Sequence, residues 1–267
     1  MSPDSRHPAK SVPESVYAVG LPVGVAATVI AVWQAGVMVS GVSRVILPAP
    51  SDVLSAFHGT VGELLRQGLA TGSESLIAFL LCCTLGLAVA LVLSSSVIAF
   101  EACYPNIVVF QIIPKIALAP LFTFWLGITT PSRLTYAVFI SFFPVALSTM
   151  TGLARANANA LRLCQALGAS RWQTFFSVKV PYSLPYFFSG AKIAATMSVI
   201  GIVVGEFISA NQGLGYYILR AQAYGQTPRI FAALVFLCAL GLLLYLLPMG
   251  GERLMRKWWH GRRRGKS

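Results

Sequence analysis

The sequence predicts an all-α membrane protein with six transmembrane helices. Hydrophobic residues make up 56% of the 267 residues, charged residues only 10%, and the mean hydropathy is +0.73. A soluble domain carries about a quarter charged residues. Several apolar stretches are also long enough to cross a hydrocarbon core, which needs roughly 20 residues in a helix. We expect spans at residues 16–40, 76–99, 104–128, 134–154, 185–208 and 230–250, within a transmembrane domain of residues 16–251.

Four of these spans contain no charged residue, so their insertion into the bilayer carries no cost for burying a charge. The third contains Lys115, and the fifth contains Lys192 near its start and Glu206 near its end. Gly201 and Gly205 in the fifth span have the four-residue spacing that lets helices approach closely. This spacing predicts tight packing of the fifth span against a neighbour.

The connection between the first two spans contains an amphipathic helix. Ser51 is the expected N-cap, because its hydroxyl can accept a backbone N–H of the first turn. Such a helix is expected along the outer membrane surface, with contact to an external partner as the alternative. Its apolar residues fall on one face: Val53, Leu54, Phe57, Val61, Leu64 and Leu65.

Orientation follows from the basic residues, which are retained on the cytoplasmic side during insertion. With six spans both ends share a side, and that side together with the loop of residues 155–181 holds thirteen of the twenty Lys and Arg residues. We therefore predict cytoplasmic tails at residues 1–15 and 252–267 and a cytoplasmic loop at 155–181. The same bias explains the net charge of +12, so no nucleic-acid partner is expected.

Neither a metal site, a cofactor site nor a catalytic centre is expected. The five cysteines lie mostly inside apolar runs without CxxC spacing, and the three histidines are scattered in loops. The C-terminal segment 260–267 has three residues between its glycines, whereas a phosphate-binding loop has four. ATP is therefore expected on another subunit.

The loop between the fourth and fifth spans has strong local signals. Ser170 and Gln173 have capping-box spacing, which starts a helix at Ser170. Gly168 can adopt the left-handed conformation that ends the preceding helix. The pattern predicts a helix, a glycine turn and a second helix, which Pro181 and Pro185 stop before the fifth span begins.

This loop is also unusually apolar for a cytoplasmic connection, which indicates that it docks on a partner. A surface-lying connection without a partner is the alternative. The apolar side chains are Leu161, Leu163, Ala166, Leu167, Trp172 and Phe175.

These residues resemble the permeases of ABC importers. Gly168, followed ten residues later by Val178-Lys179-Val180-Pro181, is similar to the family motif of Glu-Ala-Ala, three residues, Gly, nine residues, Ile, one residue and Leu-Pro. Further strings resemble, in order and spacing, the nitrate, sulfonate, taurine and thiamine-precursor or riboflavin branch. They lie at residues 47–53, 113–122, 168–172, 205–208 and 213–216.

The resemblance implies a type I importer permease of the MetI-like fold in a bacterial inner membrane, with a coupling helix between the fourth and fifth spans. The implied partners are a second permease copy in a homodimer, two cytoplasmic ABC ATPase subunits that bind the ATP, and an external solute-binding protein or lipoprotein. The implied solute is a thiamine precursor, pyrimidine or riboflavin-type heterocycle, or an aliphatic sulfonate, taurine or nitrate. The chain itself is then a transport protein and not an enzyme.

The resemblance also assigns contact with the ATPase to part of the loop. The sequence departs from the family at Arg162-Leu163-Cys164, which stand where the motif has Glu-Ala-Ala. A salt bridge from that Glu therefore cannot be carried over, and Arg162 is left as a contact with an unknown partner. The coupling residues are Arg162, Leu163, Gln165, Ala166, Leu167, Gly168, Ala169 and Ser170.

Polar residues within the spans indicate the transport pathway. A charge such as Lys115 costs roughly 2.5–3.5 kcal/mol at the bilayer centre, so it must face protein or water. Pro114 and Pro120 disrupt helix hydrogen bonding beside it. Glu206 is its candidate ion-pair partner; pairing of either residue with the second copy, or direct contact with the solute, are the alternatives. The pathway candidates are Gln111, Lys115, Glu206 and Asn211.

A self-sufficient ion-coupled secondary transporter is the alternative function. Such carriers show internal repeats, broken helices and acidic ion sites. Here Glu74 and Glu206 are the plausible intramembrane carboxylates. The sequence therefore favours the importer permease.

Overall fold

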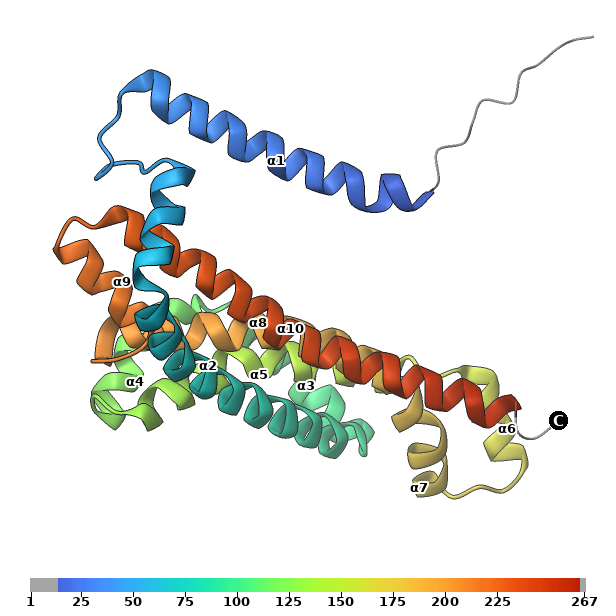
Figure 1. The fold of residues 1–267 in the computed structure, drawn as a ribbon. Helices are drawn as coiled ribbons and strands as arrows, with labels where there is room; N and C mark the ends of the chain where they lie inside the picture. The colour runs from blue at the N-terminus through green and yellow to red at the C-terminus, as the bar shows by residue number, and fades with distance from the viewer. Residues whose placement is uncertain (1–13, 265–267) are drawn as a thin grey trace, which may run out of the picture.

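The computed structural model describes residues 14–264, with side chains for residues 20–257, and that part of the chain is entirely helical (Figure 1). Most of the expected tail 1–15 and the end of the tail 252–267 lie outside the described residues. The long helices are α1 (Glu14–Ser40), α2 (Pro50–Ser94), α5 (Thr130–Ala154), α8 (Val180–Ser209) and α10 (Thr227–Arg264). The short ones are α3 (Val97–Ile112), the 3-10 helix η1 (Lys115–Leu118), α4 (Ala119–Leu126), α6 (Ala158–Ala166), α7 (Arg171–Thr174), the π-helix η2 (Phe175–Lys179) and α9 (Leu214–Ala223).

Five helices of the described chain are long and apolar enough to cross a membrane, and a sixth crossing exists if the bent pair α3 and η1–α4 counts as one span. The span expected over residues 104–128 is broken, because the chain bends by 84° between these two pieces. Pro114 has no N–H to donate at the bend. The Lys115 ammonium bonds the Gln111 carbonyl at 2.9 Å, the oxygen that a continuous helix would offer to the Lys115 backbone.

The core is the pair α5 and α8, which pack most extensively on each other and are flanked by α2 and α10. Small residues line their contact. A Cβ added to Gly201 would lie 2.7 Å from the Cα of Ala137, so only glycine lets the two backbones come this close. The close packing expected of the fifth span is thereby confirmed.

Helix α2 differs from its expectation. The amphipathic segment of residues 53–66 is not a separate surface helix; it is the first part of a 45-residue helix that continues into the second span and changes direction along its length (Figure 1). The N-cap is Ala49, whose backbone N–H donates to the Asp52 carboxylate at 3.2 Å, and not Ser51. At 1.5 Å per residue α2 is about 67 Å long, so it extends well beyond a hydrocarbon core of about 30 Å.

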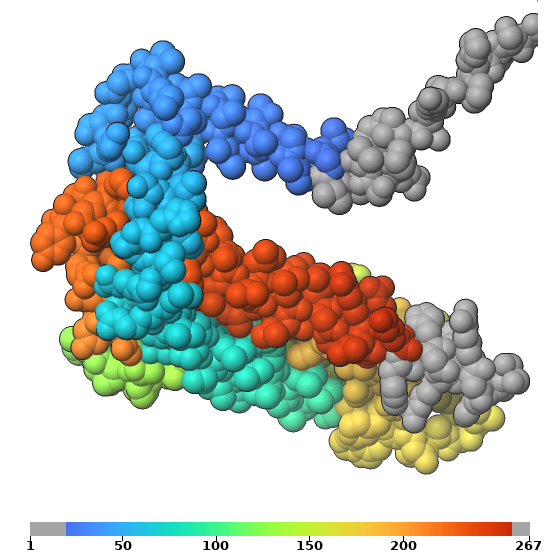
Figure 2. Space-filling view, viewed as in Figure 1, coloured from blue at the N-terminus to red at the C-terminus, as the bar shows by residue number. Residues whose placement is uncertain are grey.

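Helix α1 stands clear of the rest of the chain (Figure 2). Only 6% of its membrane-crossing window is buried. Its C-terminal end is anchored, because Gln34 donates to the Ser51 hydroxyl at 3.2 Å and accepts the Ser51 backbone N–H at 3.1 Å. Most of its apolar surface therefore contacts no other described residue of the chain.

Candidate functional site

The loop between α5 and α8 folds around one glycine. Asn157 caps α6, since its side-chain oxygen accepts two backbone N–H groups of the first turn. At the other end the Ala169 N–H donates to the Cys164 carbonyl at 2.9 Å, and Gly168 has a φ of +70°. This is the arrangement of a left-handed C-terminal cap, which confirms the predicted helix end.

The capping box is confirmed as well. The Ser170 backbone N–H donates to the Gln173 side-chain oxygen at 2.7 Å, and the Gln173 N–H donates to the Ser170 hydroxyl at 3.2 Å. The expected stop at Pro181 and Pro185 is wrong, however, because helix runs without interruption from Arg171 to Ser209 through η2. The wider π turn lies directly before Pro181, in the stretch whose hydrogen bonding a proline would disturb.

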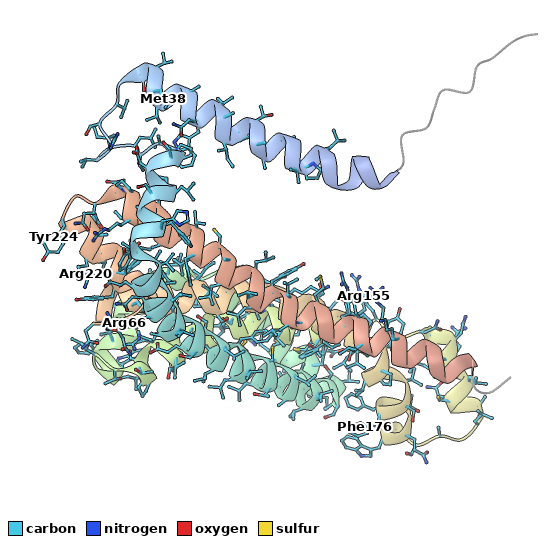
Figure 3. All side chains as sticks on the ribbon, viewed as in Figure 1. Met38, Arg66, Arg155, Phe176, Arg220 and Tyr224 are labelled. Atoms are coloured by element: carbon cyan, nitrogen blue, oxygen red, sulfur yellow. The ribbon has the colours of Figure 1, made fainter. Side chains whose placement is uncertain are left out.

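One aromatic residue fixes this loop to the spans, and other apolar residues point outward. Phe175 is buried with Ala90, Met150 and Leu153 of α2 and α5. The exposed apolar residues of the loop are Leu163 and Leu167, which are 60% and 76% exposed, together with Trp172 and Phe176 (Figure 3). The loop is thus held rigidly at its base and presents apolar surface at its tip.

A cavity of about 570 Å³ lies between α6 and the start of α8. Among the eight predicted coupling residues only Ala169 is partly buried, and the others are exposed. None of the ion pairs between described side chains includes Arg162. The cavity is lined by Asn157, Asn159, Ala160, Leu163, Ser177, Val178, Pro181 and Tyr182.

The expected pairing of Lys115 with Glu206 is wrong within this chain. Glu206 is 2% exposed, and its two oxygens accept the Thr71 hydroxyl and the Gly215 backbone N–H, both at 2.7 Å. Lys115 lies at the break of the third span and contacts Gln111 and the ring of Phe143 instead. Glu206 is therefore enclosed by hydrogen-bond partners, whereas Lys115 lies partly exposed at the break of another helix.

Glu206 is part of a side-chain cap on α9. Gln67 accepts the Gly213 N–H at 2.7 Å, and the Thr71 hydroxyl accepts the Leu214 N–H at 2.8 Å, next to the bond from Gly215 to Glu206. These donors have no partner inside the helix itself. Asn211 is exposed in the turn before them, while the expected external turn of residues 211–216 ends early, since α9 begins at Leu214.

A buried ion pair lies beside this cap. Arg133 of α5 donates two bonds to the Glu74 carboxylate, at 3.0 and 2.6 Å, and a third to the Ser209 carbonyl at 3.0 Å. Arg133 is 6% exposed. Sequence reasoning missed the pair because the fourth span was expected to begin at residue 134, which left Arg133 outside it. The signal was two opposite charges directly before the uncharged runs of the second and fourth spans.

Two further ion pairs connect helices that lie far apart in the sequence. Lys192 of α8 donates to Glu252 of α10 at 2.5 Å, a pairing that the sequence did not reveal. Arg220 of α9 bonds Glu63 of α2, and this hydrogen bond raises the pKa of the Arg220 guanidinium. Both pairs stabilise contacts around the central helices.

The five cysteines are free thiols. Among the described side chains no group of three or more His, Cys, Asp or Glu residues is arranged to hold a metal ion.

Comparison with known proteins agrees with this geometry. Residues 83–256 match the family model described as binding-protein-dependent transport system inner membrane component. The chain is 32% identical to the formylaminopyrimidine transport permease protein ThiX of Halalkalibacterium halodurans, over 85% of this chain and 91% of that protein. It is 34% identical to the riboflavin transport system permease protein RibX of Chloroflexus aurantiacus, over 90% of each.

A more distant relative is the taurine transport system permease protein TauC of Escherichia coli, 28% identical over 91% of this chain and 90% of that protein. Among solved structures, the inward-facing MetNI methionine ABC transporter matches with a TM-score of 0.61 and 20% identity, over 74% of this chain and 97% of that one. The predicted MetI-like fold is thus confirmed.

The Arg133–Glu74 pair gives a stability prediction. Arg133→Met leaves the Glu74 carboxylate buried without its partner, which costs about 3–5 kcal/mol. We expect a large loss of melting temperature in detergent, and a smaller loss in the double variant Arg133→Met/Glu74→Met. Glu101→Met, at an exposed site, is the control. A double variant whose melting temperature is as low as that of Arg133→Met would contradict a cost that comes from the unpaired Glu74 carboxylate.

Proposed function

The chain belongs to the family of binding-protein-dependent transport system inner membrane components, and from this premise we propose that α6 and α7 transmit the ATPase cycle to its transmembrane helices. It is the permease subunit of an ABC importer. ATP is hydrolysed by a partner subunit, and an external binding protein works with the complex. The observation that carries the proposal is the exposed apolar tip at Leu163 and Leu167.

The alternative of an ion-coupled secondary transporter is set aside. The relatives are permeases of ABC importers, and the matching structure is an ABC transporter. The two intramembrane carboxylates are also engaged by hydrogen bonds, Glu74 with Arg133 and Glu206 with Thr71 and Gly215.

The coupling contact works through shape and apolar burial in this proposal. Leu163 and Leu167 are one helical turn apart, so both can enter one groove of the ATPase subunit. Arg162 is the exposed charge next to them, and it takes an acidic partner in place of the family's Glu contact. A contact that differs between the nucleotide states is what allows ATP to shift the state of the permease.

The motion reaches the membrane along one continuous helix. Residues Arg171–Ser209 form 39 helical residues without a break, so displacement of α7 moves α8 directly. The buried Phe175 connects the same point to α2 and α5. The base of the loop therefore acts as the lever between the ATPase and the α5–α8 pair.

We also propose a homodimer with cytoplasmic termini. Six crossings from one chain provide half of a two-fold pathway, and the unpartnered surface of α1 supports a second copy. The N-terminal end of α1, the C-terminal end of α10 and the α6–α7 loop lie toward the same end of the structure (Figure 1), which supports a common side of the membrane for all three.

The solute in this proposal is a thiamine-precursor, pyrimidine or riboflavin-type heterocycle, with a sulfonate, taurine or nitrate as the second candidate. The support is sequence identity, which is higher to the formylaminopyrimidine and riboflavin permeases, at 32% and 34%, than to the taurine permease, at 28%.

Leu167→Asp tests the coupling contact. Desolvating a carboxylate in an apolar groove is costly, so we expect ATP hydrolysis stimulated by the loaded binding protein to fall at least tenfold in the reconstituted complex. Ala158→Asp places the same charge at the favourable N-terminal end of α6 and is the control. Stimulated ATP hydrolysis at the wild-type rate in Leu167→Asp would contradict the docking role of Leu167.

Orientation is tested by Cys164, a partly exposed thiol of α6. With the other four cysteines replaced by alanine, a membrane-impermeant maleimide is expected to label Cys164 in inside-out vesicles and not in right-side-out vesicles. The reverse result would place the loop outside the cell and refute the coupling role.

Native mass spectrometry of the complex with its binding protein tests the composition and the solute. We expect two copies of this chain per complex and a retained heterocycle of the pyrimidine or flavin class. A hetero-oligomer of two different permeases would contradict the homodimer, and retained taurine or sulfonate would favour the second candidate.

A further inference from the structure

Lys115 is a membrane cation that the chain leaves uncompensated. It lies in η1, at the 84° bend of the third span. Lys192, the other Lys or Arg inside an expected span, pairs with Glu252, and Arg133, directly before the fourth span, pairs with Glu74. None of the ion pairs between described side chains includes Lys115. The contrast within one molecule makes this position exceptional.

The contacts of the Lys115 ammonium leave it with spare donors. It has three N–H groups, and the structure gives it one acceptor, the Gln111 carbonyl at 2.9 Å. Its remaining neighbour is the ring of Phe143, whose centroid lies 5.1 Å from the nitrogen. An aromatic face attracts a cation without accepting a conventional hydrogen bond from it.

The surroundings fix the position of this group. Phe143 is buried on α5, and its ring packs edge-on against Phe139, which in turn contacts Phe122 of α4. The next aromatic residue in this row, Tyr136, is 1% exposed, and its hydroxyl has no hydrogen-bond partner. The packed rings of Phe143, Phe139, Phe122 and Tyr136 therefore connect the bend to α5.

The bend exposes polar groups beside the apolar side chains of Ile112 and Ile116. Gln111 and Pro114 are exposed there, and Lys115 is only partly covered. In hydrocarbon, an amide side chain and an ammonium with free donors would both lack hydrogen-bond partners. Irregular backbone at membrane depth is tolerated where it lines a water-filled cavity or lies against protein.

We propose that Gln111, Lys115 and Phe143 form a solute subsite on the translocation pathway, which binds acceptor atoms of the solute through the Lys115 ammonium. This rests on the proposed function, since it assumes that the chain lines a pathway. The ligand chemistry is an acceptor oxygen, supplied by the carbonyl of a heterocycle or by a sulfonate. Phe143 holds the ammonium in place, and the Gln111 carbonyl occupies one donor when no solute is bound.

Aqueous accessibility tests the subsite without knowledge of the solute. In a chain whose five cysteines are replaced by alanine, Lys115→Cys is treated with sulfonatoethyl methanethiosulfonate, a charged and membrane-impermeant thiol reagent, in the assembled complex. We expect labelling at least tenfold faster than at Phe124→Cys on the neighbouring helix, where the native side chain is apolar and 83% exposed. Equal, slow labelling at both positions, as when Lys115 is buried against the second copy, would overturn the proposal.

Uptake in proteoliposomes tests the role in transport, with labelled riboflavin and labelled taurine as probes for the two ligand sources. For the probe that the wild-type complex takes up, we expect at least a tenfold loss in Lys115→Met, a smaller loss in Lys115→Arg and no loss in Phe124→Leu. Wild-type uptake in Lys115→Met would overturn the subsite.

The two proposals fail in different ways. A wild-type complex whose ATPase does not respond to the loaded binding protein contradicts the proposed function, whereas a responsive complex with fully active Lys115→Met contradicts the subsite alone. Where the wild-type complex takes up neither probe, the labelling result decides.

Discussion

The buried ion pair between Arg133 and Glu74 is the constraint on which the half of the structure next to α9 depends. Two charges removed from water are tolerated only when their hydrogen bonds are complete. Arg133 meets this requirement with the carboxylate of α2 and the Ser209 carbonyl at the end of α8. One side chain therefore fixes three helices relative to each other. Glu206 extends the same arrangement to α9 by accepting the Gly215 N–H at the start of that helix.

The half next to the 155–181 loop depends mainly on close packing, with one ion pair between Lys192 and Glu252. Gly152 and Gly190 let α5 and α8 approach closely there, and Phe175 inserts between α2 and α5 where the loop joins them. Because helix is continuous from Arg171 to Ser209, the loop and the α5–α8 pair move together. In the proposed coupling, a displacement at Arg171 reaches Ser209, whose carbonyl accepts a hydrogen bond from Arg133, along about 60 Å of helix at 1.5 Å per residue.

Local signals in the sequence predicted local structure well. The apolar runs predicted the membrane crossings, and Gly168, Ser170 and Gln173 predicted the helix ends of the loop, because their partners lie within five residues. Features that depend on distant partners were missed. Arg133 lies 59 residues from Glu74, and Lys192 lies 60 from Glu252. The lengths of two helices were also misjudged. Helix continues through Pro181 instead of stopping there, and α2 begins well before the expected second span.

Glu206 and Lys115 show why position in the sequence does not separate structural from functional charges. Both are charged residues inside apolar spans, and a charge at membrane depth is costly in lipid. Glu206 is fully enclosed and each of its oxygens has a partner within the chain, so a solute could bind it only by breaking the cap of α9. Lys115 is partly exposed and has one acceptor for three donors. A group with free hydrogen-bonding capacity can respond to a passing solute at little structural cost, whereas a fully satisfied group serves to hold the helices in place.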